Sequence, residues 1–182
     1  MRGGVATSRK IYIESSCFVE LAKHAIGSGN IDRTSDVWHL KALLQAAKDG
    51  KVQILTATLT VAECQHAEEP SSSGIPCDAV KAIFKNFLTS GQYIALVQDT
   101  VLVAERARNL RWAHGICMSG PDSLHAASAL EMSCDEFLSF DRQFHKRKKE
   151  LEVLAIHVCM PRNTTCLPDE YRQESLLETQ DE

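Results

Sequence analysis

Short apolar runs alternate along this chain with longer stretches in which apolar residues recur every three or four positions. The short runs predict buried strands at residues 10–14, 51–56, 92–97, 136–140 and 151–158. The longer stretches predict helices at residues 15–26, 35–50, 59–64, 78–88, 100–113 and 122–132, with a basic helical turn beginning at Asp141. Because strands separated by helices pair in parallel, this order predicts an α/β fold with a mainly parallel central sheet covered on both faces.

Two segments interrupt the alternation. Residues 68–77, EEPSSSGIPC, are rich in Ser, Gly and Pro and are predicted to form a loop. Residues 167–182 carry six acidic side chains against Arg172 alone, so we expect an acidic C-terminal tail that is poorly ordered or docked on another part of the molecule. The rest of the 182 residues fits one domain, which we place at residues 1–166.

The balance of charge limits which partners the body of the chain attracts. The chain has 20 Lys and Arg against 24 Asp and Glu, a net charge of −4. The tail contributes 1 − 6 = −5, which leaves 19 − 18 = +1 for the rest. A body this close to neutral does not bind nucleic acid through its overall charge, so phosphate contacts depend on local patches. Two candidates, each either an RNA contact or a solvated face, are the run Arg142 to Lys149 and the cluster Arg106, Arg108 and Arg111.

The cysteines and the apolar content indicate the cellular compartment. Seven cysteines are present, an odd number, and none forms a C-x-x-C pair, so we interpret them as reduced thiols that mostly pack in the interior. No apolar run approaches the roughly 18–20 residues that a membrane-spanning helix needs. The first ten residues, MRGGVATSRK, lack the apolar segment of a secretory signal. These features predict a cytoplasmic protein.

Four acidic residues fall where predicted strands end or where the next helix begins. Glu14 ends the first strand, Glu63 lies in the helix after the second, Asp122 opens a helix after a Gly-Pro turn, and Asp141 follows the strand EFLSF. Open parallel sheets bind ligands at this edge. Each acid also has a structural explanation. Thr60 to Glu63 fits a capping box, in which Glu63 would accept a backbone N–H. Asp122 and Asp141 fit the first turns of helices, and Glu14 fits a solvated strand end.

If the four carboxylates meet in one cleft, they repel one another and need a cation between them. Carboxylate oxygens suit a hard divalent ion, Mg²⁺ or Mn²⁺, rather than zinc. One or two such ions activate water and neutralise the charge that develops during phosphodiester hydrolysis. Converging acids would therefore indicate a metal-dependent nuclease.

The acids and their neighbours resemble the motifs of the PIN-domain nucleases, and among them the VapC-type toxin ribonucleases. The first strand continues as Ile11-Tyr-Ile-Glu14-Ser15-Ser16, where the family has Asp followed by Thr-Ser or a similar pair. The second to fourth motifs are similar to Thr58-Leu-Thr-Val-Ala-Glu63, Asp122-Ser-Leu-His-Ala-Ala127 and Phe137 to Asp141. All four occur in the family's order, and the resemblance covers residues 10–160.

The resemblance implies a three-layer α/β/α domain that cleaves single-stranded RNA by metal-activated water. The resemblance implies that Glu14, Glu63, Asp122 and Asp141 hold Mg²⁺ or Mn²⁺ in this domain. Ser16 takes the position that the family uses near the metal or to orient water. The resemblance also implies an antitoxin as partner, in a toxin–antitoxin pair, and a homodimer.

One residue departs from the family, because Glu14 stands where the family has Asp. Its carboxylate lies about 1–1.5 Å further from the backbone, and a displacement of that size can lower a rate about a hundredfold. The alternative interpretation is therefore a catalytically weak or inactive PIN-like module that binds RNA or a protein.

Two further features have both a functional and a structural interpretation. His125 shares a helical face with Asp122, as a general base would, but we expect a hydrogen-bonded structural histidine. The second feature is a set of apolar residues in the first two predicted helices, namely Phe18, Leu21, Trp38, Leu40 and Leu44. They form either core packing or a groove that takes an antitoxin helix, as the resemblance suggests.

Overall fold

The computed structural model describes residues 8–67 and 76–172, and its centre is a five-stranded sheet. The strands are β1 (Arg9–Ile13), β2 (Val52–Ala57), β3 (Ile94–Val97), β4 (Glu136–Leu138) and β5 (His157–Cys159). They lie in the order β3-β2-β1-β4-β5, and every neighbouring pair is parallel. In the central strand, Ile11 lies opposite Ile54 of β2 and Glu136 of β4. The predicted parallel sheet is confirmed.

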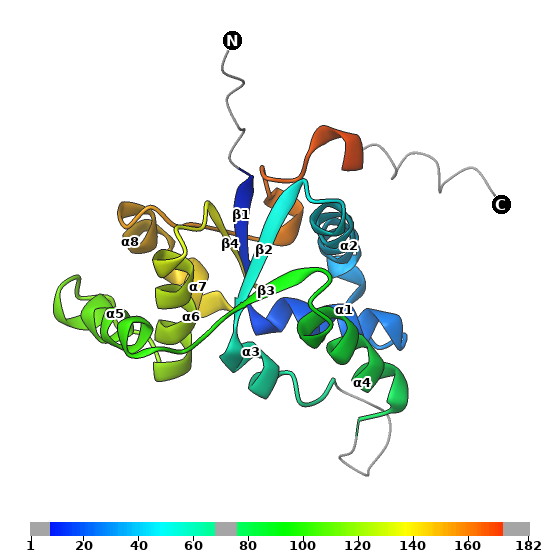
Figure 1. Ribbon diagram of the computed structural model, residues 1–182, viewed down its shortest axis with the longest axis horizontal. Helices are drawn as coiled ribbons and strands as arrows, with labels where there is room; N and C mark the ends of the chain where they lie inside the picture. The colour runs from blue at the N-terminus through cyan, green and yellow to red at the C-terminus, as the bar shows by residue number, and fades with distance from the viewer. Residues whose placement is uncertain (1–7, 68–75, 173–182) are drawn as a thin grey trace.

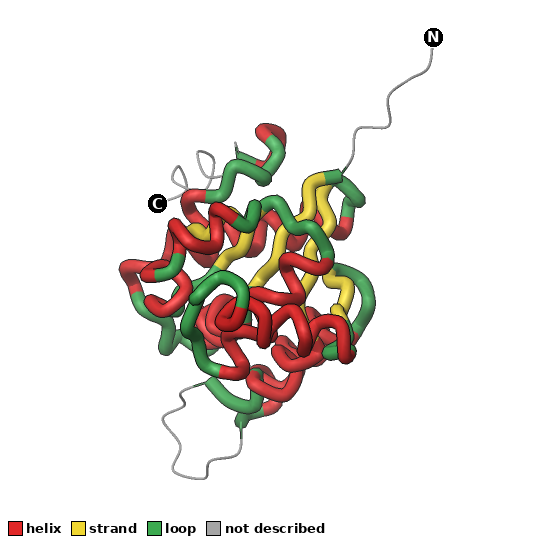
Figure 2. The backbone as a smooth tube through the Cα atoms, turned by 90° about the vertical axis from the view of Figure 1, so that its left-hand side faces the viewer, coloured by secondary structure: helices red, strands yellow, loops and turns green. Residues whose placement is uncertain are grey.

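Helices cover both faces of the sheet and give three layers (Figure 1). One face carries α1 (Ser15–Ala25), α2 (Thr34–Lys48) and α4 (Asp78–Phe84), which continues as a π-helical turn, Lys85–Thr89. The other face carries α5 (Val101–Trp112), α6 (Gly120–Glu131), α7 (Arg142–Lys146) and α8 (Lys148–Val153). The short helix α3 (Thr58–Glu63) directly follows β2 at the lower edge of this view. From the side of α5 to α8, the helices stand in front of the strands (Figure 2).

The core is divided in two by the sheet. Ile11 and Ile13 of β1 pack with the residues of α1 and α2, whereas Tyr12 packs on the opposite side with those of α6 and α7. The same alternation separates Ile54 from Leu55 in β2. Successive side chains of a strand point to opposite faces, so a strand buried on both sides needs apolar residues at consecutive positions. This requirement explains the unbroken apolar runs in the sequence.

The prediction of a last strand at residues 151–158 is wrong over its first half. Residues 148–153 form α8, in which Leu151 is fully buried, and β5 spans only three residues. Lys148 and Glu152 lie one helical turn apart and form an ion pair at 3.7 Å, a spacing that favours a helix. The segment LEVL is too short for its apolar pattern to decide between helix and strand, and the tertiary packing of Leu151 settles it.

The apolar residues of the first two helices belong mostly to the core. Phe18, Leu21, Leu40 and Leu44 are at most 3% exposed, so the groove interpretation was wrong for them, and Trp38 is partly exposed. Burial of these side chains fastens α1 and α2 to the sheet. Five of the seven cysteines are buried, as predicted.

The C-terminal segment packs on the body as far as the structure describes it. Leu167 is 2% exposed, and the Tyr171 hydroxyl donates a hydrogen bond of 2.7 Å to Asp49 beyond α2. Residues 173–182 of the predicted tail, and residues 68–75 of the predicted loop, lie outside the described residues. Within residues 8–67 and 76–172, none of the helices has the length and apolar character that crossing a membrane requires.

Candidate active site

The carboxyl ends of the strands meet at one edge of the sheet, the lower edge in Figure 1. The central strand β1 lies between β2 and β4, so the chain crosses over to opposite sides of β1, and open α/β sheets bind ligands at such a point. Glu14 directly follows β1, α3 follows β2, and residues 139–141 follow β4. The fold therefore brings three of the predicted motifs to one edge.

Glu14 caps the start of α1 and is only 6% exposed. Its Oε1 atom accepts hydrogen bonds from the Ser15 hydroxyl and, at 3.1 Å, from the Ser16 backbone N–H. Its Oε2 atom accepts hydrogen bonds from the Ser16 hydroxyl and, at 2.9 Å, from the Ser139 hydroxyl. A carboxylate has about four lone-pair sites. These four donors therefore satisfy the Glu14 carboxylate within the protein itself.

The same serines tie Glu14 to the loop that carries Asp141. The Ser139 hydroxyl accepts a hydrogen bond of 2.9 Å from the Asp141 backbone N–H, and the Ser16 hydroxyl accepts one of 3.0 Å from the Phe140 backbone N–H. Glu14 is thus the centre of a network that joins the start of α1 to the end of β4. An acid in this position has a structural role in addition to any chemistry.

Glu63 is the last residue of α3 and faces His125 of α6. Its Oε2 atom lies 2.7 Å from His125 Nε2, and His125 Nδ1 lies 2.8 Å from the Tyr12 hydroxyl. That hydroxyl accepts a hydrogen bond of 2.9 Å from the Ala57 backbone N–H, so its own hydrogen is available to His125 Nδ1. A neutral imidazole with its proton on Nε2 satisfies the whole chain of bonds and donates to Glu63. Because α3 begins at Thr58, the capping box considered for Glu63 is not formed.

This network keeps Glu63 ionised and Tyr12 protonated. Partial burial raises the pKa of Glu63, but the interaction with His125, chiefly the hydrogen bond from its Nε2–H, outweighs burial and leaves the pKa below its usual value. Burial raises the pKa of the Tyr12 hydroxyl far above its usual value. His125 is 1% exposed and bonded at both nitrogens, which confirms that it is a hydrogen-bonded histidine of the interior.

Glu14, Glu63 and His125 each place one potential ligand atom within 4.8 Å of the other two. In the part of the chain that the structure describes, no other three acidic, His or Cys residues approach one another this closely. Asp122 lies in the first turn of α6, and Asp141 caps α7. The side chains thus bring together two of the four predicted acids and a histidine, and they leave Asp122 and Asp141 outside this set.

A family model of the PIN domain matches residues 11–150. The chain belongs to the PIN domain family. Two solved structures share the fold of this PIN domain. VapBC2 from Rickettsia felis, bound to a DNA fragment from their promoter, is 15% identical, with a TM-score of 0.53 over 82% of this chain and 98% of the other. FitAB bound to the IR36 DNA fragment is also 15% identical, with a TM-score of 0.53 over 85% of this chain and 96% of the other. No curated protein matches the chain significantly.

Two partners in the PIN domain's site were missed by sequence reasoning. Ser139, which donates to Glu14, and Tyr12, which contacts His125, are both polar residues within buried runs. A buried polar group needs a hydrogen-bond partner, so a lone polar residue in an apolar strand signals a contact, although it does not say with what. Ser16, which was predicted from the resemblance, does contact Glu14.

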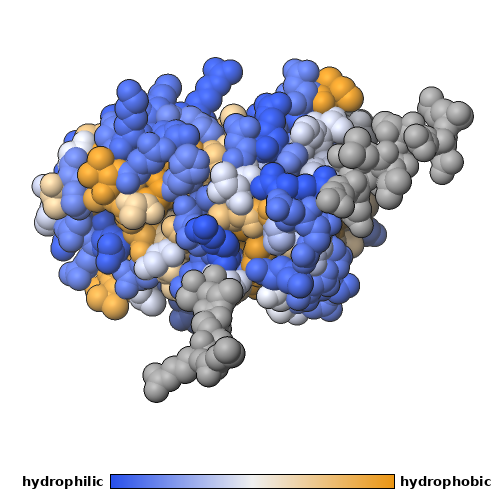
Figure 3. Space-filling view, turned by 90° about the horizontal axis from the view of Figure 1, so that it is seen from above, coloured by the Kyte–Doolittle hydropathy of each residue, from blue (hydrophilic) through white to orange (hydrophobic). Residues whose placement is uncertain are grey.

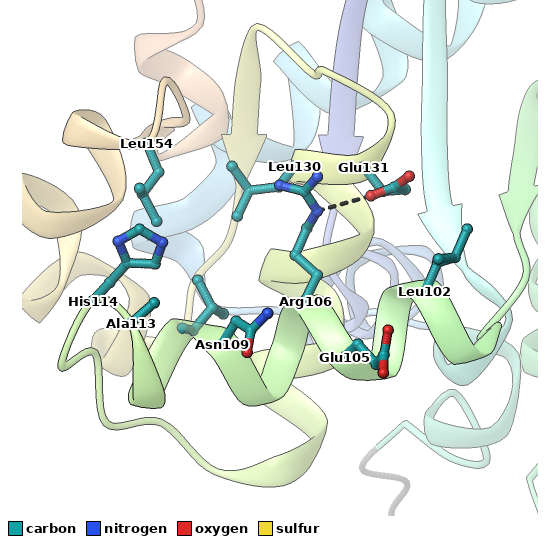
Figure 4. A pocket seen from close by; sticks show the side chains of 10 residues that line it. Leu102, Glu105, Arg106, Asn109, Ala113, His114, Leu130, Glu131 and Leu154 are labelled. Carbon is teal, nitrogen blue, oxygen red and sulfur yellow. Dashed lines mark hydrogen bonds and ion pairs between the residues drawn. The ribbon is translucent and has the colours of Figure 1, made fainter.

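The helical layer of α5 to α8 differs from the carboxylate edge. From above, hydrophobic residues appear at the surface on this side (Figure 3), and those exposed by at least 65% are Val101, Leu102, Trp112 and Val153. A cavity of about 440 Å³ lies between α5 and α6 (Figure 4) and contains none of the four acids. Arg106, one of the predicted basic cluster, pairs with Glu131 across this cavity at 2.8 Å.

Proposed function

We propose that this PIN domain is a metal-dependent endoribonuclease that cleaves single-stranded RNA and is the toxin of a toxin–antitoxin pair. The observation that supports the proposal best is the convergence of Glu14 and Glu63 at the switch point of the sheet, in a chain of this family. Asp122 and Asp141 complete the proposed catalytic set, and Ser16 assists it. Asp122 lies in the first turn of α6 and Asp141 caps α7, and negative charge is favoured at both positions.

The donor chemistry of the site fits a hard divalent ion, Mg²⁺ or Mn²⁺. The Asp122 carboxylate makes no hydrogen bond or ion pair with any described residue, and Asp141 uses one oxygen, at 2.7 Å, to accept from the Gln143 backbone N–H. The nearby Cys64 is a poor metal ligand, because metals bind the thiolate and burial raises the pKa of this thiol to about 12. Oxygen donors therefore dominate, and these suit Mg²⁺ or Mn²⁺. Such an ion, when bound, would activate water and neutralise charge on the phosphate.

The chain's own residues have separate roles in this proposal. His125 is a positioning residue, because it holds the Glu63 carboxylate in one orientation and has no nitrogen left to accept a proton from water. Ser139 and Ser16 hold Glu14 against the loop of Asp141. A carboxylate fixed by neighbouring hydrogen bonds loses less entropy when it binds a ligand, which favours binding.

We propose an antitoxin as the protein partner. The two solved structures with this fold, VapBC2 and FitAB, are antitoxin–toxin complexes bound to DNA fragments. Because the predicted groove on α1 and α2 is mostly core, an antitoxin has to use other surface on this chain. The predicted homodimer remains an expectation that light scattering of the purified chain can check.

The proposal is tested by incubating the purified chain with labelled single-stranded RNA in Mn²⁺, Mg²⁺ or EDTA. We expect cleavage with metal only, leaving 3′-hydroxyl and 5′-phosphate ends, and a loss of about a hundredfold or more in Asp122→Asn. Asp99→Asn is the matched control, because Asp99 follows β3 at the same edge but accepts a hydrogen bond of 2.7 Å from the Thr58 hydroxyl. Activity in EDTA, or undiminished activity of Asp122→Asn, would contradict the proposal.

A second candidate function is a PIN module without catalytic activity that binds RNA or a protein. Glu14 favours this candidate, because four protein donors already occupy its carboxylate and an ion would have to displace one of them. The substitution Glu14→Asp restores the residue that the family uses. A wild type that is inert with both metals, beside a Glu14→Asp variant that cleaves RNA, supports the second candidate. Titration calorimetry with Mn²⁺ compares metal binding in the two proteins without relying on cleavage.

A further inference from the structure

A second cavity, of about 310 Å³, opens beside Asp122 between the start of α6 and α7. Its lining consists of Cys117, Met118, Ser119, Asp122, Gln143 and Arg147. Of the two acids that lie outside the cluster of Glu14, Glu63 and His125, Asp122 lines the cavity, and Asp141 accepts a hydrogen bond from the backbone N–H of the lining residue Gln143. Pockets for small molecules occupy about 300–1,000 Å³, so this volume suits a ligand no larger than one nucleotide.

The lining offers three kinds of contact. Arg147 pairs with Glu150 at 3.3 Å, but both side chains are more than a third exposed, and such a pair contributes little and leaves most of the five guanidinium N–H donors available. The side-chain amide of Gln143 makes no hydrogen bond to another described residue and supplies both a donor and an acceptor. Met118 is partly buried and adds an apolar wall that packs on the core.

We propose that this cavity is the subsite for the nucleotide next to the scissile phosphate, an assignment that rests on the ribonuclease function proposed above. Arg147 binds a backbone phosphate of the RNA, because a guanidinium matches phosphate oxygens with paired N–H donors. The base lies against Met118 and bonds to the Gln143 amide. Single-stranded RNA fits this arrangement, since its unstacked bases can turn into a pocket and present their edges.

The inference is tested by the binding of a labelled single-stranded RNA oligonucleotide in EDTA, where the proposed cleavage cannot occur, at several salt concentrations. We expect Arg147→Gln to bind about tenfold more weakly, as for the loss of one charged hydrogen bond. We also expect the slope of log affinity against log salt to decrease by about 0.7, the value for one phosphate contact on a single strand. A residue with a purely structural role would not change this slope.

The matched control is Arg9→Gln, because Arg9 is an exposed, ion-paired arginine at the start of β1, outside this cavity. We expect its affinity and its salt slope to equal those of the wild type. An unchanged slope in Arg147→Gln, or an equal change in both variants, overturns the subsite while leaving the ribonuclease proposal intact. A wild type that neither binds nor cleaves RNA refutes both proposals.

The reactivity of the Cys117 thiol gives a second measure of RNA binding in this cavity that requires no change to Arg147 or Gln143. It is an exposed thiol in the cavity lining, and a Cys77→Ser background removes the other exposed thiol. We expect saturating RNA to slow alkylation of Cys117 by N-ethylmaleimide several-fold, as followed by mass spectrometry. Alkylation at the same rate in free and RNA-bound protein would show that the nucleotide lies elsewhere.

Discussion

Replacing His125 by Phe is expected to lower the free energy of unfolding by about 3 kcal/mol. His125 is 1% exposed, and it bonds to the Tyr12 hydroxyl at 2.8 Å and to Glu63 at 2.7 Å. A hydrogen bond to a charged group contributes about 1.5–3 kcal/mol, and a stranded buried hydroxyl costs about 1–3 kcal/mol. The lower end applies to Glu63, whose side chain is 29% exposed and can bond to water instead. A loss of this size is a large part of the roughly 5–15 kcal/mol that stabilises a domain.

The measurement is urea-induced unfolding followed by circular dichroism, with equal slopes required before midpoints are compared. Tyr12→Phe and the double variant complete a double-mutant cycle. Each single variant leaves the other residue without its hydrogen-bond partner, so we expect the double variant to lose about 1–2 kcal/mol less stability than the sum of the two single losses. His39→Phe, at a partly exposed histidine of α2, serves as the control and should change stability by no more than about 0.5 kcal/mol. Additive losses, or a loss below about 1 kcal/mol in His125→Phe, would refute the reasoning.

Three further outcomes are expected. Because folding lowers the pKa of Glu63, its carboxylate contributes stability that is present above pH 4.5 and is lost as the pH falls through the lowered value. Glu63→Gln should therefore flatten the decline of the unfolding free energy below pH 4.5. Arg33→Met should lower the free energy of unfolding in urea by about 2 kcal/mol, because the buried Glu20 carboxylate loses its ion pair of 2.7 Å. Loss of a partner in a fully buried pair costs about 3–5 kcal/mol, and we expect less here because the Arg33 side chain is 35% exposed. Gly27→Ala should cost about 1 kcal/mol and lower the midpoint of thermal unfolding, because Gly27 has φ +76° while nothing lies within 4 Å of an added Cβ; an unchanged midpoint would contradict this.

Local pattern was enough for most of the architecture. A strand that is buried on both faces needs consecutive apolar residues, and those runs are visible in the printed sequence at β1 and β2. The same reasoning failed at residues 151–153, where a run of four residues fits either period and burial of Leu151 against the sheet decides for the helix. The position of a helix cap was uncertain for a related reason, because the N-cap of α3 is Ala57, whereas the Thr60–Glu63 spacing suggested Thr60.

For the candidate site, the sequence alone determined which acids follow which strands, and a parallel sheet then places the ends of those strands at one edge. Only the tertiary structure decided which side chains touch. Ser139 donates to Glu14 across 125 residues of sequence, and Tyr12 contacts His125 across 113. Such contacts depend on the direction of each side chain and on the packing of separate helices, and no local spacing encodes either. This is why Glu14 and Glu63 meet beside a histidine while Asp122 instead faces a cavity with Arg147.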